Sequence, residues 1–117
     1  MLNLAHITFD CADAAALAGF WSGALGRPVD DGANEYFATI GSADPGPTFM
    51  FLKVGEDKTA KNRCHLDLTA DDRDAEVKRL LDLGATYEAE HDEYGHRWIV
   101  LRDPSGNEFC VAGNAAR

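Results

Sequence analysis

The chain has 117 residues, of which 45% are hydrophobic and 26% charged, and it carries a net charge of -9 at pH 7. This size and balance predict one globular domain, and they exclude a disordered chain and a coiled coil. An acidic surface repels phosphate groups, so we expect neither nucleic acid nor a membrane surface as a partner.

The sequence predicts a cytoplasmic protein. The longest apolar-leaning stretch, Ala14 to Trp21, is only eight residues long, whereas a membrane span needs about twenty. The N-terminus shows neither the basic nor the apolar region of a secretory signal. Three cysteines, Cys11, Cys64 and Cys110, are too few and too odd in number for a disulfide framework, so reduced thiols are expected.

The first half of the chain predicts a strand, a helix and three further strands. His6 to Asp10 forms the first strand, and Asp13 is a good N-cap for the helix that follows. A weak strand is expected around Pro28 to Asp31, then strands over Glu35 to Ile40 and Thr48 to Val54. The helix has an apolar stripe at helical spacing and ends at a glycine; the stripe comprises Leu17, Phe20, Trp21 and Ala24.

The second half predicts the same order of elements. His65 to Thr69 forms a strand, and Asp71 or Asp72 caps a helix that stops at Leu83-Gly84. A weak strand over Thr86 to Glu90 and strands over His96 to Arg102 and Asn107 to Ala112 follow, with an Asp-Pro-Ser-Gly turn between the last two. The apolar stripe of this helix comprises Val77, Leu80 and Leu81.

The two halves look like a divergent duplication. The histidines that open them, His6 and His65, are 59 residues apart, and the glycines that end the helices, Gly26 and Gly84, are 58 apart. Each half therefore reads β-α-β-β-β. A ferredoxin-like α+β sandwich also combines two helices with several strands, but the repeat favours two similar modules.

Strand alternation separates an apolar face, which meets each helix, from a polar face. If the sheet is flat, the polar face meets solvent; if it curls, the same groups line a cup. The strand Thr48 to Val54 differs, because Met50 and Leu52 share a face that carries no carboxylate or imidazole. The polar faces of the first strand of each half and of the last strand carry His6, Thr8, His65, Asp67, Glu108 and Cys110.

Five motifs follow one another along the chain: His6-Ile-Thr-Phe, the Leu25-Gly26 helix end, Lys61-Asn-Arg, His65-Leu-Asp-Leu and Asp103-Pro-Ser-Gly-Asn-Glu-Phe-Cys-Val. In this order they resemble the vicinal oxygen chelate superfamily, which includes glyoxalase I, bleomycin-resistance proteins and extradiol dioxygenases. The resemblance implies an α+β fold, a single glyoxalase-like domain over residues 1–117. Its two βαβββ modules, about 1–58 and 59–117, have mixed sheets that curl to form a cup.

The resemblance also implies four metal-ligand positions, on the first and last strand of each module. The first-strand positions are His6 and His65, and the last position of the second module is Cys110. The equivalent in the first module falls at Met50 or Leu52. The predicted metal ligands are therefore His6, His65 and Cys110.

The family's last ligand is a glutamate, and this chain departs from that pattern. The glutamate comes seven residues after the aspartate of the Asp-Pro motif, and seven after Asp103 is Cys110. Glu108 lies two residues earlier on the same face, where it is expected beside the metal. Two imidazoles and a thiolate suit a borderline or soft ion. One divalent metal (Zn, Ni, Fe or Mn) is one expectation, and no metal is the other.

Without a metal, His6 and His65 are candidates for hydrogen bonding or acid–base work. A basic cluster, Lys58, Lys61 and Arg63, either places an anionic ligand or balances Glu56 and Asp57. Trp98 either forms a flat apolar wall of a ligand site or packs in the core. The predicted ligand-binding residues are His6, Thr8, Met50, Leu52, His65, Asp67, Trp98, Glu108 and Cys110.

Two classes of function follow from the resemblance. The first is a glyoxalase- or bleomycin-resistance-like protein that binds a small organic ligand in the cup, without assured catalysis. The alternative is a metal-dependent lyase, isomerase or dioxygenase acting on a small oxygenated substrate, and no catalytic residue is assigned. A homodimer is also expected, because members of the superfamily are commonly dimers and the helix stripe with Phe20 and Trp21 is strongly apolar.

Overall fold

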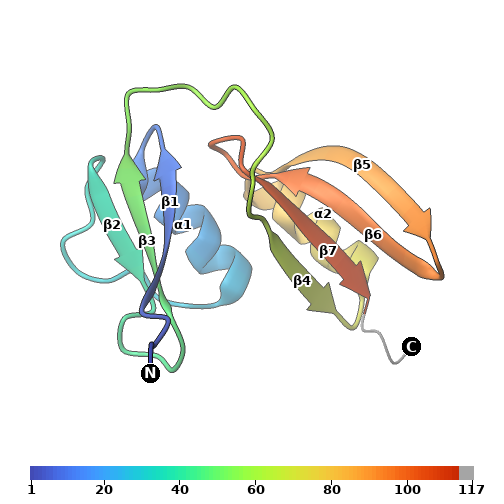
Figure 1. Ribbon diagram of the computed structural model, residues 1–117, viewed down its shortest axis with the longest axis horizontal. Helices are drawn as coiled ribbons and strands as arrows, with labels where there is room; N and C mark the ends of the chain where they lie inside the picture. The colour runs from blue at the N-terminus through green and yellow to red at the C-terminus, as the bar shows by residue number, and fades with distance from the viewer. Residues whose placement is uncertain (114–117) are drawn as a thin grey trace. The chain divides into compact units, whose positions relative to one another are not determined.

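The computed structural model describes residues 1–113 and divides the chain into two compact units. The first unit is Met1–Asp57, and the second begins at Lys58. Each unit packs one helix on one mixed sheet, so the predicted α+β fold of two similar modules is confirmed (Figure 1). Over residues 1–113, every helix is too short or too polar to cross a membrane.

The first unit has a three-stranded sheet in the order β1-β3-β2. β1 pairs with β3 in parallel, and β2 pairs with β3 antiparallel. The weak strand expected after the helix is reduced to one bridge between Val29 and Ile40, so the module keeps the βαβββ order. Its elements are β1 (His6–Cys11), α1 (Ala14–Leu25), β2 (Phe37–Ile40) and β3 (Thr48–Lys53).

α1 forms where its capping residues and apolar spacing predict it. The Asp13 carboxylate accepts a hydrogen bond from the Ala16 amide at 3.1 Å, and the helix ends at Gly26, whose φ of 67° is left-handed. Leu17 and Trp21 are buried on the sheet side, as the stripe predicted. The first unit therefore closes around an aromatic core, which includes Phe9, Phe20, Trp21, Phe49 and Phe51.

The second unit has a four-stranded sheet in the order β4-β7-β6-β5. β4 pairs with β7 in parallel, and the other two pairings are antiparallel. This is the full βαβββ module, with its first and last strands side by side as in the first unit. Its elements are β4 (Leu66–Ala70), α2 (Arg73–Leu83), β5 (Thr86–Glu93), β6 (His96–Arg102) and β7 (Glu108–Gly113).

α2 decides one detail that the sequence prediction left open and corrects another. Of the two candidate caps, Asp72 accepts the bond from the Ala75 amide, at 3.0 Å. Val77 and Leu80 are buried, but Leu81 is 38% exposed, so its place in the apolar stripe was wrong. Leu81 is turned about 100° from Leu80 around the helix, so Val77 and Leu80 are buried while Leu81 points away from them.

The Asp-Pro-Ser-Gly turn determines where β7 begins. The buried Asp103 carboxylate accepts hydrogen bonds from the amides of Ser105, at 2.9 Å, and Asn107, at 3.0 Å. Gly106 has a φ of 87°, which other residues rarely adopt. Because Asn107 belongs to this turn, the strand starts one residue later than predicted, at Glu108.

Candidate functional site

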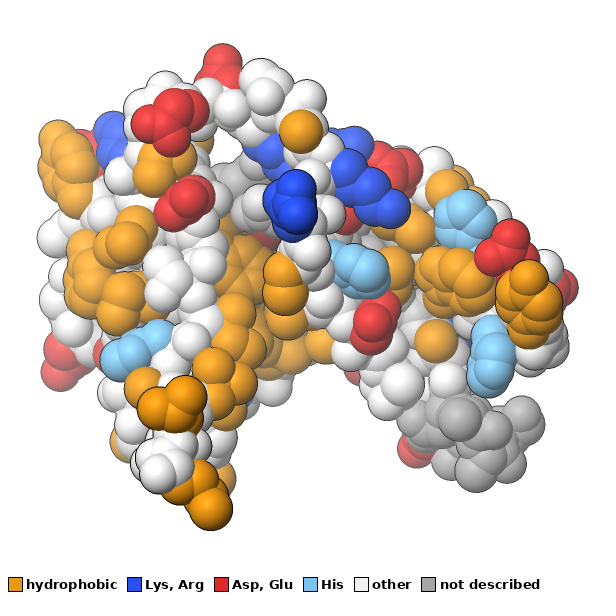
Figure 2. Space-filling view, in the orientation of Figure 1, with side chains coloured by type: hydrophobic (Ala, Val, Ile, Leu, Met, Phe, Trp, Pro, Cys, Tyr) orange, Lys and Arg blue, Asp and Glu red, His pale blue; other side chains and the backbone are white. Residues whose placement is uncertain are grey.

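The sheet of the second unit has a polar face, by which we mean the face opposite α2. Strand register sets its side chains in two adjacent rows. Figure 2 shows histidine and hydrophobic side chains next to each other over this unit. The rows are Asp67, Cys110, Val100 and Ala89, and then Thr69, Ala112, Trp98 and His91.

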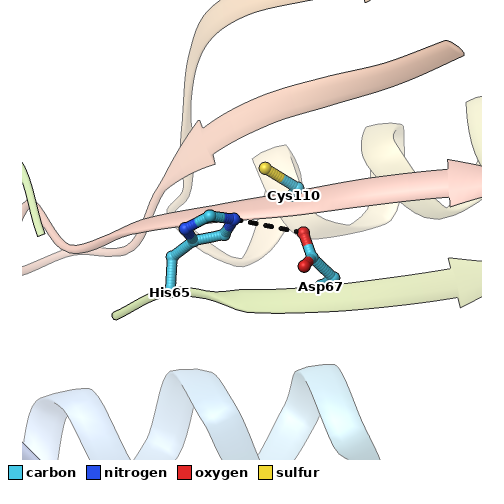
Figure 3. Close-up of side chains that lie close together, drawn as sticks. All are labelled: His65, Asp67 and Cys110. Atoms are coloured by element: carbon cyan, nitrogen blue, oxygen red, sulfur yellow. Dashed lines mark ion pairs between the residues drawn. The ribbon is translucent and has the colours of Figure 1, made fainter. Parts of the chain in front are cut away.

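Three side chains at the β4 edge of the polar face come together: His65, Asp67 and Cys110 (Figure 3). Asp67 and Cys110 are direct partners in the parallel pairing of β4 and β7. His65 precedes β4 by one residue, and its Nε2 lies 3.3 Å from Asp67 Oδ1. One ligand atom from each residue lies within 4.8 Å of the others. The group therefore collects a nitrogen, an oxygen and a sulfur donor in one place.

Cys110 is the buried member of this group. Burial, together with the charge and hydrogen bonding of Asp67, raises the pKa of the Cys110 thiol to about 11, while Lys61 acts in the opposite direction. At neutral pH the thiol is therefore protonated and donates to the carboxylate. It is a poor nucleophile in this state, because the thiolate is the reactive form.

Glu108 lies in a second polar cluster beside this group. Its buried carboxylate pairs with Lys58 Nζ at 2.5 Å and with Arg102 Nη1 at 3.8 Å, and it accepts from the Asn62 amide at 3.0 Å. Burial alone would raise the pKa of Glu108, but these partners outweigh it and lower the pKa. The basic residue Lys58 is thus engaged inside the protein, and the cluster ties the segment before β4 to the sheet.

Trp98 forms the aromatic part of the polar face. It is half-buried on β6 and stacks on His91 of β5, with ring centroids 5.2 Å apart and planes inclined by 25°. A cavity of about 720 Å³ adjoins it and is lined also by Thr69 and Ala112. His91 was not among the ligand-binding residues predicted from the sequence. The signal was available: a hairpin turning at Tyr94-Gly95 puts His91 opposite Trp98.

The first unit presents a different set at the equivalent positions. His6 and Thr8 are exposed on β1, and Met50 and Leu52 are half-buried on β3. Thr8 pairs with Met50, just as Asp67, also two residues after a histidine, pairs with Cys110. Between the two candidates, the register therefore selects Met50 as the counterpart of Cys110. The first unit offers a hydroxyl and a thioether where the second offers a carboxylate and a thiol.

Comparison with known proteins identifies the relatives of this fold. The family profile described as a glyoxalase-like domain matches residues 6–112. No curated protein matches the chain.

Three solved structures are similar to this chain. Their sequence identities to it are low, so the similarity is one of fold alone. A glyoxalase/bleomycin resistance protein/dioxygenase family enzyme from Burkholderia phytofirmans PsJN is 18% identical, with a TM-score of 0.76 over 96% of this chain and 98% of that chain. A lactoylglutathione lyase from Agrobacterium tumefaciens is 18% identical, with a TM-score of 0.66 over 97% and 95%. The fosfomycin resistance protein FosX from Mesorhizobium loti is 17% identical, with a TM-score of 0.71 over 98% and 94%.

Proposed function

The chain belongs to the glyoxalase-like domain family, within the vicinal oxygen chelate superfamily, and we propose that it binds a small oxygenated organic ligand on the polar face of its second unit. The observation that carries this proposal is the layout of that face. An aromatic pair, Trp98 and His91, stands on one side, and hydrogen-bonding groups, His65 and Asp67, stand on the other. Ligand sites commonly combine an apolar wall with a few convergent polar groups.

The floor between these two sides supports the same function. Ala112, Val100 and Ala89 occupy neighbouring register positions on the polar face. Ala112 also lines the cavity beside Trp98, which extends from Thr69 to the start of α2 at Asp72 and Arg73. A ligand with a flat apolar portion would contact Trp98, and its oxygen groups would reach His65 and Asp67.

Binding is favoured over catalysis by the state of Cys110. The position where the family carries a glutamate holds a protonated thiol in this chain, and that thiol donates to Asp67. A protonated thiol is neither an effective base nor an effective nucleophile at neutral pH. The polar face therefore has groups that orient a ligand, but its buried cysteine does not supply a reactive atom.

Tryptophan fluorescence tests the proposal, because the chain has two tryptophans in different surroundings. Trp98 is half-buried on the polar face, whereas Trp21 is fully buried and serves as a constant reference. S-lactoylglutathione, fosfomycin and bleomycin are suitable probes, since the solved structures that share the fold bear these names. At least one probe should change the emission saturably, and His65→Ala should weaken its binding about tenfold through one lost polar contact.

The matched control is Trp98→Phe, which keeps an aromatic wall and removes the signal. A saturable change that persists in Trp98→Phe would place the ligand elsewhere. Emission that stays constant with all three probes, together with no heat of binding by calorimetry, would count against the proposed function.

A metal-dependent lyase, isomerase or dioxygenase is the second candidate function. The observation that favours it is the approach of three donor atoms at His65, Asp67 and Cys110. A divalent cation, when bound, polarises an oxygen of the substrate. Formation of a product from any of the three probes by zinc-loaded protein, followed by NMR, would select this function over binding alone.

We further propose that the protein is a cytoplasmic homodimer. In the part of the chain that the structure describes, Cys11, Cys64 and Cys110 form no disulfide, which suits a reducing compartment. Several large apolar side chains are exposed, which suits a contact between copies. Light scattering at micromolar concentration should give twice the mass of one chain. The exposed side chains include Leu2, Leu4, Tyr36, Phe37 and Tyr87.

A further inference from the structure

Residues 58–62, which lead toward β4, form a loop that is held against the sheet of the second unit. The Asn62 amide donates to Glu108 Oε2 at 3.0 Å, and Lys58 Nζ pairs with the same carboxylate at 2.5 Å. Lys58 also donates to the carbonyl of Ala60, within the loop. Both ends of the loop are therefore fixed to one buried carboxylate.

This loop lies on the same side of the sheet as the proposed ligand. Glu108 and Cys110 are two residues apart on β7, so their side chains point to the same face. Glu108 stands one row of side chains, about 7 Å along the strand, from the row that contains Asp67 and Cys110. Figure 2 shows Lys and Arg side chains gathered over this end of the second unit, next to a histidine. The loop therefore borders the polar face.

Lys61 is the cation of this loop that is available to a ligand. The other cation of the loop, Lys58, is engaged by Glu108. Lys61 is exposed, and in the part of the chain that the structure describes no hydrogen bond or ion pair engages it. Its charge lies near enough to Cys110 to oppose the rise in the pKa of that thiol. A lysine with no partner of its own thus stands at the rim of the polar face.

Resting on the ligand-binding function proposed above, we infer that the polar face selects ligands that carry a carboxylate or phosphate group, and that Lys61 recognises this group. A hydrogen bond from a lysine to such an oxyanion is charge-assisted and stronger than one between neutral groups. The chain has 20 acidic and 11 basic residues, so most of its surface repels an anion. Asp67 adds a negative charge on the polar face itself, and Lys61 is the residue that offsets it.

Aromatic probes that share one ring and differ in one substituent test this preference: phenyl phosphate, benzoate, benzamide and benzylamine. The ring of each can stack on Trp98, so only the charge of the substituent varies. Calorimetry at low salt measures each dissociation constant with the full chain. Phenyl phosphate or benzoate should bind at least about tenfold more tightly than benzamide, and benzylamine no more tightly than benzamide. The tighter of the two anions identifies the group, and added salt should weaken its binding.

Substitutions of exposed lysines assign the preference. Lys61→Met keeps the length of the side chain and removes its charge, so it should abolish the preference and leave benzamide binding unchanged. Lys61→Arg should retain the preference. Lys78→Met is the matched control, because it removes the same charge from α2, on the other side of the sheet, where Lys78 pairs with Asp82. Circular dichroism verifies that each variant is folded.

The inference about Lys61 is overturned by any of several results. These are equal binding of benzoate, phenyl phosphate and benzamide by the wild type, a preference that survives in Lys61→Met, an equal loss in Lys78→Met, and no binding of either anion. The fluorescence titration with the three larger probes is read separately. A saturable change there, together with equal binding of the charged and neutral aromatic probes, would leave the proposed function standing and remove only the role of Lys61.

Discussion

The two units share one topology and differ in the chemistry that it displays. In each, a first strand pairs in parallel with the last, and a helix covers one side of the sheet. The residue two after the opening histidine is Thr8 in the first unit and Asp67 in the second, and their partners are Met50 and Cys110. Two substitutions at equivalent positions therefore exchange a hydroxyl and a thioether in the first unit for a carboxylate and a thiol in the second.

The units also differ in how they are held together. The core of the first unit is aromatic, and α1 carries no charged residue. The core of the second unit is mostly aliphatic, with Leu101 and Val111 fully buried, and α2 carries ion pairs on its outer surface. The same backbone arrangement is thus stabilised by ring packing in one unit and by smaller side chains and charge pairs in the other.

Removing the central ring of the first unit should have the largest effect. Trp21 is fully buried and packs against Phe9, Phe20 and Phe49. Trp21→Ala should lower the free energy of unfolding by about 3–5 kcal/mol, and Leu80→Ala in the second unit by nearer the lower end of about 2–5 kcal/mol. Urea unfolding followed by circular dichroism measures both. A larger loss in Leu80→Ala would contradict the contrast between the two cores.

The buried ion pair of the second unit should give a smaller, pH-dependent effect. Glu108→Gln should cost about 1.5–3 kcal/mol at pH 7, because a charged group loses its hydrogen bonds. The folded state lowers the pKa of Glu108 below its usual value near 4.5. The ionised carboxylate therefore stabilises the fold above that value, and this contribution is lost as the pH falls through the lower, folded pKa. The difference between wild type and variant should accordingly shrink on acidification.

The first unit supplies the control for that experiment. Glu35 and Lys53 form an ion pair at 3.1 Å, but their side chains are 53% and 37% exposed. Solvent screens such a pair, so Glu35→Gln should change stability little at any pH. If Glu35→Gln and Glu108→Gln gave the same pH profile, burial would not be the cause of the difference.

The helix caps should give smaller effects than the core residues or the buried ion pair, and equal ones. Asp13 and Asp72 each accept one bond from the amide three residues on, at 3.1 Å and 3.0 Å. Asp13→Ala and Asp72→Ala should each cost about 1 kcal/mol, and the double variant about the sum. Thermal unfolding of the three variants measures this. Clearly unequal losses would show that the two helices depend on their caps to different degrees.

Much of the fold was predictable from the sequence because its signals are local. The Asp caps, the glycine helix ends and the alternation of strand residues each depend on neighbours within a few positions. They placed both helices and most strands within one or two residues. The exceptions were Leu81, whose exposure depends on how α2 meets the sheet, the strand expected over Pro28 to Asp31, which is reduced to one bridge, and β5, which continues to Glu93 beyond the predicted end at Glu90.

The sequence by itself determined the α+β class, the repeated module and the presence of coordinating residues on strand faces, since spacing and residue type are enough for these. Only the tertiary structure decided three contacts: Asp67 pairs with Cys110 across β4 and β7, the Glu108 carboxylate forms an ion pair with Lys58, and His91 stacks on Trp98. Each of these contacts depends on strand register or on how a connecting segment folds back. The physical reason is that a one-residue slip in pairing moves a side chain to the other face of the sheet, and no local pattern encodes that choice.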